Sequence, residues 1–157
     1  MPTPLKRHKA LVQYSKEHHF GLLLGWKIRQ GIQKNVTPQR MADYIIAASN
    51  VELMPHFHNE EIELFVLLQE LDPLRIQAEK EHFIIRQKLE ELRTEASIEG
   101  LVSFTNMLDE HIRFEERQLF PHIEQQQSFE VYASAMKAHQ MLKHADFDST
   151  WDDAFWK

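Results

Sequence analysis

The sequence contains no cysteine. Disulfides, thiolate-ligated metal sites, iron–sulfur clusters and cysteine nucleophiles are therefore all excluded. No apolar run approaches the roughly 18 residues that a helix needs to cross a bilayer. The first residues, MPTPLKRHK, are basic but lead into a polar helical pattern rather than into the apolar core of a signal peptide. We therefore expect a cytoplasmic protein that has no membrane partner.

Clusters of basic residues are also missing. The chain has 18 lysines and arginines against 24 acidic residues, and the basic residues are scattered along it. Surfaces that bind nucleic acid or anionic lipid usually gather basic residues into runs or patches. Nucleic acid is therefore not an expected partner.

Glycine and proline are scarce, with four and six residues, whereas Glu, Gln, Leu, Lys, Arg and Ala are abundant. This composition favours helices, and no stretch shows the alternating pattern of a strand. Apolar spacing and capping signals predict four long helices and a shorter fifth one, at about 5–34, 38–70, 73–94, 97–126 and from 128 onward. Because short loops join antiparallel neighbours, we expect an all-α, up-down-up-down four-helix bundle. It forms a single domain over residues 1–157, with the bundle at about 5–126 and a C-terminal helix and tail at 128–157.

Two prolines interrupt these helical patterns. Pro55 falls within the second predicted helix and Pro121 within the fourth. Proline lacks a backbone N–H and clashes with the preceding turn, so each should kink or locally unwind its helix.

One ten-residue pattern occurs twice beside these prolines. HFHNEEIELF, which begins at His56, and HIRFEERQLF, which begins at His111, both read H-x-x-x-E-E-x-x-L-F. A histidine and a glutamate four residues apart lie one turn apart on the same helix face. The apolar residues around them predict that this face points inward, so Glu60 and Glu115 are expected inside the bundle with their histidines.

Two further histidines fall on inward faces, His18 in the first predicted helix and His82 in the third. At a rise of about 1.5 Å per residue, their distances from the loops place both at the height of the two repeats. The sequence therefore predicts one polar layer inside the bundle, made of His18, His56, Glu60, His82, His111 and Glu115.

A layer of this kind is costly unless something neutralises it, because burying unpaired carboxylates destabilises a fold by several kcal/mol. Divalent cations remove the cost. Imidazole nitrogen and carboxylate oxygen, without thiolate, suit iron, manganese, zinc or cobalt. We predict that these six residues bind two metal ions, with about two histidines per ion and with both glutamates bridging the ions.

Some positions have alternatives. His19 could replace His18, since adjacent residues of a helix differ by only about 100° in direction. Glu61 and Glu116, the second glutamate of each repeat, are interpreted as partners of the ligands or as occasional ligands. We expect a core or bundle-end position for His122, and surface positions for the other histidines: His8, His58, His139 and His144.

The same residues carry a family resemblance. KEHH around His18, PHFHNEE, KEHF around His82, and EHIRFEERQLFP together resemble the hemerythrin-like, or HHE cation-binding, family over residues 8 to 125. These motifs occur in the right order on four helices, which makes the resemblance far more specific than a single H-x-x-x-E. The resemblance implies a four-helix bundle that holds a non-haem di-iron centre with oxo and carboxylate bridges, and that binds or responds to O2.

The chain departs from the oxygen-carrying members of that family at two points. Those members place a second histidine four residues after the one in the third helix, where this chain has Arg86. They also take the carboxylate of the fourth helix five residues after its histidine, which here is Glu116 rather than Glu115. The chain therefore more closely resembles the symmetrical members associated with iron or oxygen sensing, stress responses or unassigned cation binding.

Three functions are consistent with such a centre. The preferred one is a di-iron protein that binds or senses O2, NO or peroxide, or that responds to iron or oxidative stress. The alternative is a structural or homeostatic bundle that holds zinc, manganese or iron without redox chemistry. An enzyme that reduces peroxide or NO ranks third, because the sequence contains no motif for binding an electron donor.

The C-terminal tail is rich in aromatic residues, among them Phe147, Trp151, Phe155 and Trp156. Aromatic side chains of this number seldom stay in contact with water. They are expected either to fold back over the bundle end or to become buried in a homodimer.

Overall fold

The computed structural model describes residues 7–136 and 147–157. Its helical elements are, in order, η1 (Lys9–Leu11), α1 (Val12–Gln33), α2 (Pro38–Ala48), η2 (Ser49–Leu53), α3 (Met54–Glu63), η3 (Phe65–Leu67), α4 (Pro73–Thr94), α5 (Ile98–Phe114), η4 (Glu115–Leu119), α6 (Phe120–Glu124) and α7 (Phe129–Ala135). All regular structure in this part of the chain is helical. None of the described helices is both long and apolar enough to span a membrane.

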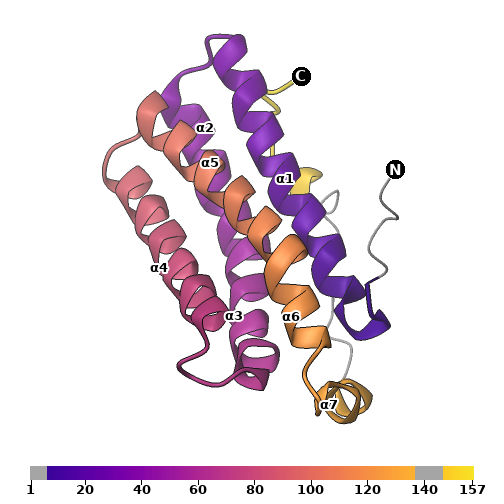
Figure 1. Ribbon diagram of the computed structural model, residues 1–157. Coiled ribbons are helices and arrows are strands. Elements are labelled where there is room, and N and C mark those ends of the chain that lie inside the picture. Colours follow the sequence, from indigo (N-terminus) through magenta and orange to yellow (C-terminus); the bar gives the residue numbers. More distant parts are fainter. Residues whose placement is uncertain (1–6, 137–146) are drawn as a thin grey trace, which may run out of the picture.

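These elements form four long segments, each antiparallel to the next, as Figure 1 shows. α1 is the first segment and α4 the third. The second runs from α2 through η2 to α3, and the fourth from α5 through η4 to α6. The short α7 lies beyond the end of α6 (Figure 1). The prediction of an all-α, up-down-up-down bundle with a short extra helix is thus confirmed.

The loops that join these segments follow the predicted signals in part. Pro38 and Pro73 stand in the first turns of α2 and α4. The Asp72 side chain accepts a hydrogen bond from the Leu74 backbone N–H at 2.9 Å, as a capping aspartate should. Thr37 has the extended backbone of an N-cap, but its side chain makes no capping hydrogen bond.

Both internal prolines follow a turn of π-helix. η2 ends two residues before Pro55, and η4 ends two residues before Pro121. In each turn a backbone N–H bonds to the carbonyl five residues back, Met54 to Ser49 in the first case. The wider turn accommodates a residue that has no N–H and needs space beside the preceding carbonyls. The local unwinding predicted at both prolines is therefore confirmed, and it takes the form of a π-turn.

The apolar core consists of two clusters, with buried polar residues between them. In α4, Ala78 belongs to one cluster and Ile85 to the other, and the fully buried His82 lies between. In α1 the same division falls at His18, which is also buried. The polar layer is therefore covered by apolar side chains toward both ends of the bundle.

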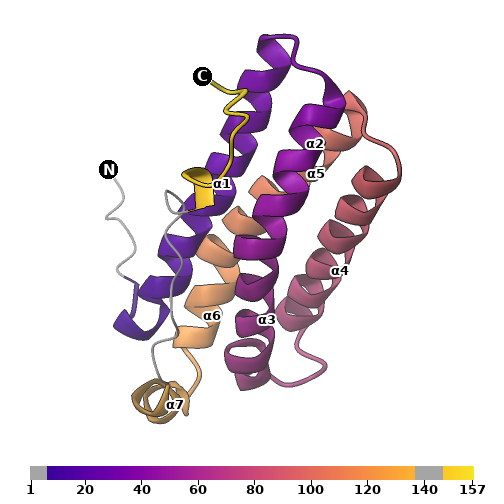
Figure 2. The same cartoon turned by 180° about the vertical axis from the view of Figure 1, so that it is seen from behind.

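The C-terminal tail packs along α1 and α2, as Figure 2 shows from behind. Phe155 is only 4% exposed, and the Tyr44 ring lies 4.8 Å from that of Trp156. The buried Lys27 donates a hydrogen bond to the Tyr44 hydroxyl at 2.9 Å and pairs with Asp148. Of the two interpretations of the tail, packing onto its own chain is the one observed, beside two helices rather than over the bundle end.

Candidate metal centre

All six residues predicted for the polar layer lie together inside the bundle. We call them the inner cluster: His18, His56, Glu60, His82, His111 and Glu115. Four of them have no exposed surface, and His18 and His56 are each 4% exposed. Each of the four long segments contributes, α1 and α4 one histidine each and the other two a histidine with a glutamate. That these residues bind metal remains a prediction, but the geometry it requires is present.

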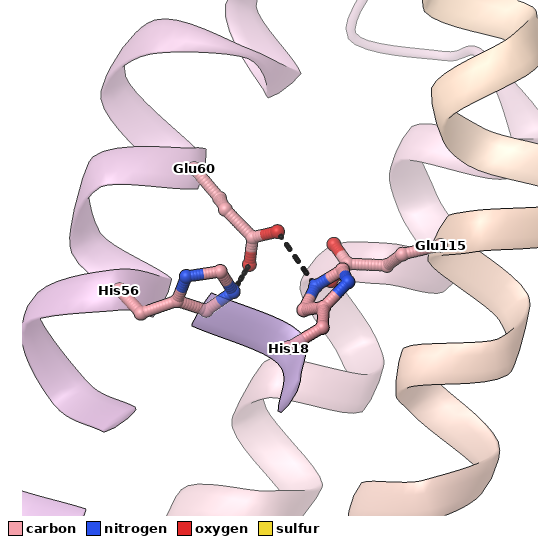
Figure 3. A group of neighbouring side chains, drawn as sticks. All are labelled: His18, His56, Glu60 and Glu115. Atoms are coloured by element: carbon pink, nitrogen blue, oxygen red, sulfur yellow. Dashed lines mark hydrogen bonds and ion pairs between the residues drawn. The ribbon is translucent and has the colours of Figure 1, made fainter. Parts of the chain in front are cut away.

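The first half of the cluster contains His18 and His56 (Figure 3). His18 Nε2 lies 2.9 Å from a Glu115 oxygen and 3.5 Å from Glu60 Oε2. His56 Nε2 lies 3.2 Å from Glu60 Oε1. Figure 3 shows Glu60 pointing toward both rings and Glu115, from a different helix, lying beside His18.

The second half contains His82 and His111, and it uses the same two glutamates. His82 Nε2 lies 3.2 Å from Glu60 Oε1, and His111 Nε2 lies 3.2 Å from Glu115 Oε1. In each half, four ligand atoms lie within 4.8 Å of one another. Glu60 and Glu115 belong to both halves, which is the arrangement that two bridged metal ions require.

Each histidine of the inner cluster is held from behind by a second glutamate. We call these four residues the outer carboxylates; each accepts a hydrogen bond from an imidazole Nδ1. The pairs are Glu116 with His18 at 2.7 Å, Glu17 with His56 at 2.8 Å, Glu61 with His82 at 2.8 Å, and Glu81 with His111 at 2.7 Å. Because a carboxylate only accepts, Nδ1 carries a proton, and Nε2 is the nitrogen that faces the interior of the bundle. A histidine that binds a metal through Nε2 usually donates its Nδ1 proton to a carboxylate in this way.

The outer carboxylates connect the four segments in a closed ring. Glu17 of α1 holds a histidine of α3, Glu61 of α3 holds one of α4, and Glu81 of α4 holds one of α5. Glu116 of η4 returns to α1. The prediction that Glu61 and Glu116 partner the ligands agrees with this geometry. Glu17 and Glu81 were not predicted, although the Glu-His pair repeated in KEHH and KEHF was a visible signal.

The inner cluster contains more polar atoms than the protein satisfies. His56 Nε2, His82 Nε2 and His111 Nε2 are buried and have no hydrogen-bond partner, and neither has either oxygen of Glu60. Buried polar atoms are almost always paired, because leaving one unpaired costs the full desolvation of that group. The unpaired atoms are imidazole nitrogens and carboxylate oxygens that face one another, and metal cations would satisfy both kinds. The donor set therefore fits a metal site.

The electrostatics of the inner cluster also favour bound positive charge. Burial disfavours a charged imidazole, but attraction to the Glu60 carboxylate and the hydrogen bond to Glu17 outweigh it and raise the pKa of His56 to about 9. The pKa of His111 is likewise raised to about 9, against the effect of burial, chiefly by the charge of Glu115. Burial opposes ionisation of Glu60, yet His56 and other histidines hold its pKa well below the usual value. Protons thus take the place of cations when no metal is bound.

Arg86, which stands where oxygen carriers have a further histidine, does not join either half of the cluster. Its guanidinium donates to both oxygens of Glu61, at 2.7 and 3.0 Å, and lies 5.6 Å from the centre of the Phe57 ring. Arg86 therefore fixes an outer carboxylate. On the other side of the bundle Arg7 donates to Glu116 in a similar way, at 3.1 Å.

The remaining described histidines lie outside the inner cluster. His19 and His58 are exposed, so the choice of His18 over His19 agrees with the structure. His122 is half-buried and bonds to Asp72 at 2.7 Å. His8 is also half-buried rather than fully on the surface, because its ring packs against that of Phe129 with centres 4.8 Å apart. Its Nδ1 accepts a hydrogen bond from Ala10 N–H. His139 and His144 lie outside the described residues.

Comparison with known proteins gives one match. The family described as Hemerythrin HHE cation binding domain matches residues 8–123. No curated protein and no solved structure matches the chain. The matched region begins before α1 and ends within α6, so it includes all six inner residues and all four outer carboxylates. This family match and the buried cluster both point to metal binding, and the chain belongs to the hemerythrin HHE cation-binding domain family.

Proposed function

We propose that the chain binds two iron ions in a non-haem dinuclear centre and uses them to bind or sense O2, NO or peroxide, or to respond to iron or oxidative stress. The observation that carries the proposal is the division of the inner cluster into two four-residue groups that share Glu60 and Glu115. Two imidazoles and two carboxylates per ion, without thiolate, form a donor set that suits iron.

The inner residues would hold the ions, with one histidine pair on each and the two glutamates between them. The outer carboxylates keep the Nδ1 protons on the far side of each ring, which leaves Nε2 free to bind and makes it more basic. They also fix the orientation of each ring through the hydrogen bond at its Nδ1. When bound, iron supplies Lewis acidity and redox chemistry that no side chain of this protein has.

Aromatic residues cover the rings and limit the access of water. Phe57 stacks on His82 with ring centres 3.8 Å apart, and Phe120 stacks on His18 at 5.3 Å. A water-poor environment strengthens the electrostatic interactions around bound ions and protects a reduced centre from side reactions. The burial of the cluster therefore supports a redox-active centre more than a surface cation site.

The symmetry of the ligand set supports sensing over reversible oxygen carriage. Each half offers two histidines and the same two glutamates. Carriers depend on an unequal pair of irons, and Arg86, which holds Glu61 instead of joining the cluster, supplies no extra ligand to create that inequality.

A second candidate function rests on the number of ligands. Four protein ligands per ion match the closed tetrahedral site that zinc prefers. In that case the bundle would hold zinc or manganese for structural or homeostatic purposes, and the bound protein would be colourless and indifferent to reductant.

Metal content and absorption together test the two candidates. Tag-free protein expressed with added iron should contain about two irons per chain by plasma mass spectrometry. It should also show a near-ultraviolet band that bleaches on reduction and returns with O2. His56→Ala and His111→Ala should each lose iron, whereas the control His122→Ala should not. Zinc without the band would support the second candidate, and no metal after reconstitution would contradict both.

A further inference from the structure

The two histidine pairs are covered to different extents. His82 and His111 have no exposed surface. Phe57 stacks on the first of these rings, and the Phe114 ring lies 6.5 Å from the second. His18 and His56 are each 4% exposed. The first pair therefore reaches solvent and the second does not.

A crevice between α1 and the η2–α3 turn leads to His56 of the first pair. It consists of two adjoining hollows of about 10 and 40 Å³, and both are lined by Glu17, Phe20, Glu52 and His56. A hollow of about 10–15 Å³ is the smallest that holds a water molecule. The larger hollow therefore admits a water-sized species, and the smaller one is at the limit of that size.

The chemistry of the crevice suits a small cation. Two of its four shared residues, Glu17 and Glu52, are carboxylates, and Phe20 forms an apolar wall beside them. Glu17 is 11% exposed and accepts the Nδ1 proton of His56 at 2.8 Å, so it joins the crevice to the inner cluster. Negative charge in a narrow cleft concentrates cations locally and raises their association rate.

The π-turn at Pro55 contributes to this crevice. Glu52 comes from η2, and the larger hollow is also lined by Val51 and Pro55. Turns of π-helix often occur at functional sites, where they change the direction of side chains within a helix. The proline that requires the wider turn is thus part of the crevice wall.

We infer that small cations enter and leave the dinuclear centre through this crevice, and that the His18–His56 half fills before the His82–His111 half. The inference rests on the proposed function, since it requires that the inner cluster binds metal. It assigns Phe20 and Glu52, which line both hollows, to the control of the loading rate. The equilibrium affinity for the metal ions is set by the residues of the inner cluster.

Stopped-flow loading of the full-length apoprotein with Co²⁺ tests this route, because bound cobalt absorbs visible light. Phe20→Trp narrows the crevice and should slow loading, whereas Phe20→Ala should accelerate it. Glu52→Gln should slow loading about two- to fivefold at low salt, with a smaller effect at high salt. All three variants should still bind two ions. Matched controls are the exposed Phe83→Trp on α4 and Glu110→Gln on α5, which should load at the wild-type rate.

The order of filling is tested with variants that keep one histidine pair. His111→Ala, which keeps the first pair, should show the fast phase of loading. His18→Ala, which keeps the second pair, should show only the slow phase. Two bound ions with wild-type rates in the Phe20 and Glu52 variants would overturn the route and leave the metal centre intact. An apoprotein that takes up no Co²⁺ and no iron would overturn both this inference and the proposed function.

Discussion

Replacing Glu81 with glutamine changes the charge behind the metal centre without altering any of the six inner residues. Glu81 accepts the Nδ1 proton of His111 at 2.7 Å, and its side chain is 16% exposed. Burial opposes its ionisation, but the hydrogen bond to His111 is strong enough to lower its pKa below the usual value. Glutamine is nearly the same size and still offers an oxygen acceptor. The substitution therefore removes the negative charge and keeps most of the geometry.

The expected magnitude follows from what is lost. Removing the partner of a metal-binding histidine typically weakens metal affinity about 10- to 100-fold. Hydrogen bonds to a charged group are roughly twice as strong as hydrogen bonds between neutral groups. Glutamine can still accept a neutral hydrogen bond from His111, so only the contribution of the charge is lost. The loss should therefore lie at the lower end, about tenfold, or about 1.4 kcal/mol. It should fall on one of the two ions, because His111 belongs to one half of the cluster.

Competition between the protein and a coloured chelator for Co²⁺ measures this loss. Glu79→Gln is the matched control, since Glu79 lies on the same helix but is 48% exposed and pairs with Arg75. The effect should vanish in a His111→Ala background, where the hydrogen bond no longer exists. If Glu81→Gln binds Co²⁺ as tightly as the control, Glu81 does not support metal binding. If its loss of affinity persists without His111, Glu81 acts through its charge and not through the hydrogen bond. Either result would refute the reasoning.

Three further predictions concern stability. Asp72→Ala should destabilise the protein by about 1–2 kcal/mol in urea unfolding, because the cap on Leu74 and the bond to His122 are both lost, whereas Asp72→Asn should lose less. Burial opposes ionisation of Asp72, but hydrogen bonds to His122 and to the Leu74 N–H lower its pKa in the folded protein. The ionised carboxylate therefore stabilises the fold at pH values above the pKa of the unfolded chain. This contribution is lost as the pH falls through the lower pKa of the folded protein. When the pH falls from above to below about 4, the free energy of unfolding should therefore decrease less for Asp72→Asn than for the wild type. Equal decreases would contradict the role assigned to the Asp72 carboxylate. Phe155→Ala should cost about 3–5 kcal/mol in the same unfolding assay because the ring is buried against Gly31, and an unchanged midpoint would mean that the tail is not part of the fold. Chelation of bound metal should lower the melting temperature measured by calorimetry, since ions that bind only the folded state stabilise it, and an unchanged temperature would argue against metal in the core.

The polar layer could be predicted from the sequence because helix periodicity and loop positions fix both the direction and the height of a residue. His82, for example, follows the same inward stripe as Ile85 and Leu89, and it is fully buried. Antiparallel segments of similar length then bring the layer together. The prolines likewise predicted a local departure from α-helix, although the π-turn itself depends on hydrogen bonds that the sequence does not specify.

The outer carboxylates were harder to predict because each acts on a neighbouring helix. Whether Glu17 reaches His56 depends on the rotation of α1 against α3, which is set by packing rather than by either helix alone. The same applies to the tail. Its attachment depends on Lys27, a buried charge that the Tyr44 hydroxyl and the Asp148 carboxylate satisfy from separate parts of the chain. Sequence spacing gives no measure of such contacts.

The central claim is that two metal ions lie between two histidine pairs and share Glu60 and Glu115. X-ray diffraction from iron-loaded crystals, recorded on both sides of the iron absorption edge, tests it most directly. The account predicts two anomalous peaks inside the bundle, one beside His18 and His56 and the other beside His82 and His111. Both glutamates should lie between the peaks. A single peak, or peaks that one of these glutamates does not touch, would contradict the account.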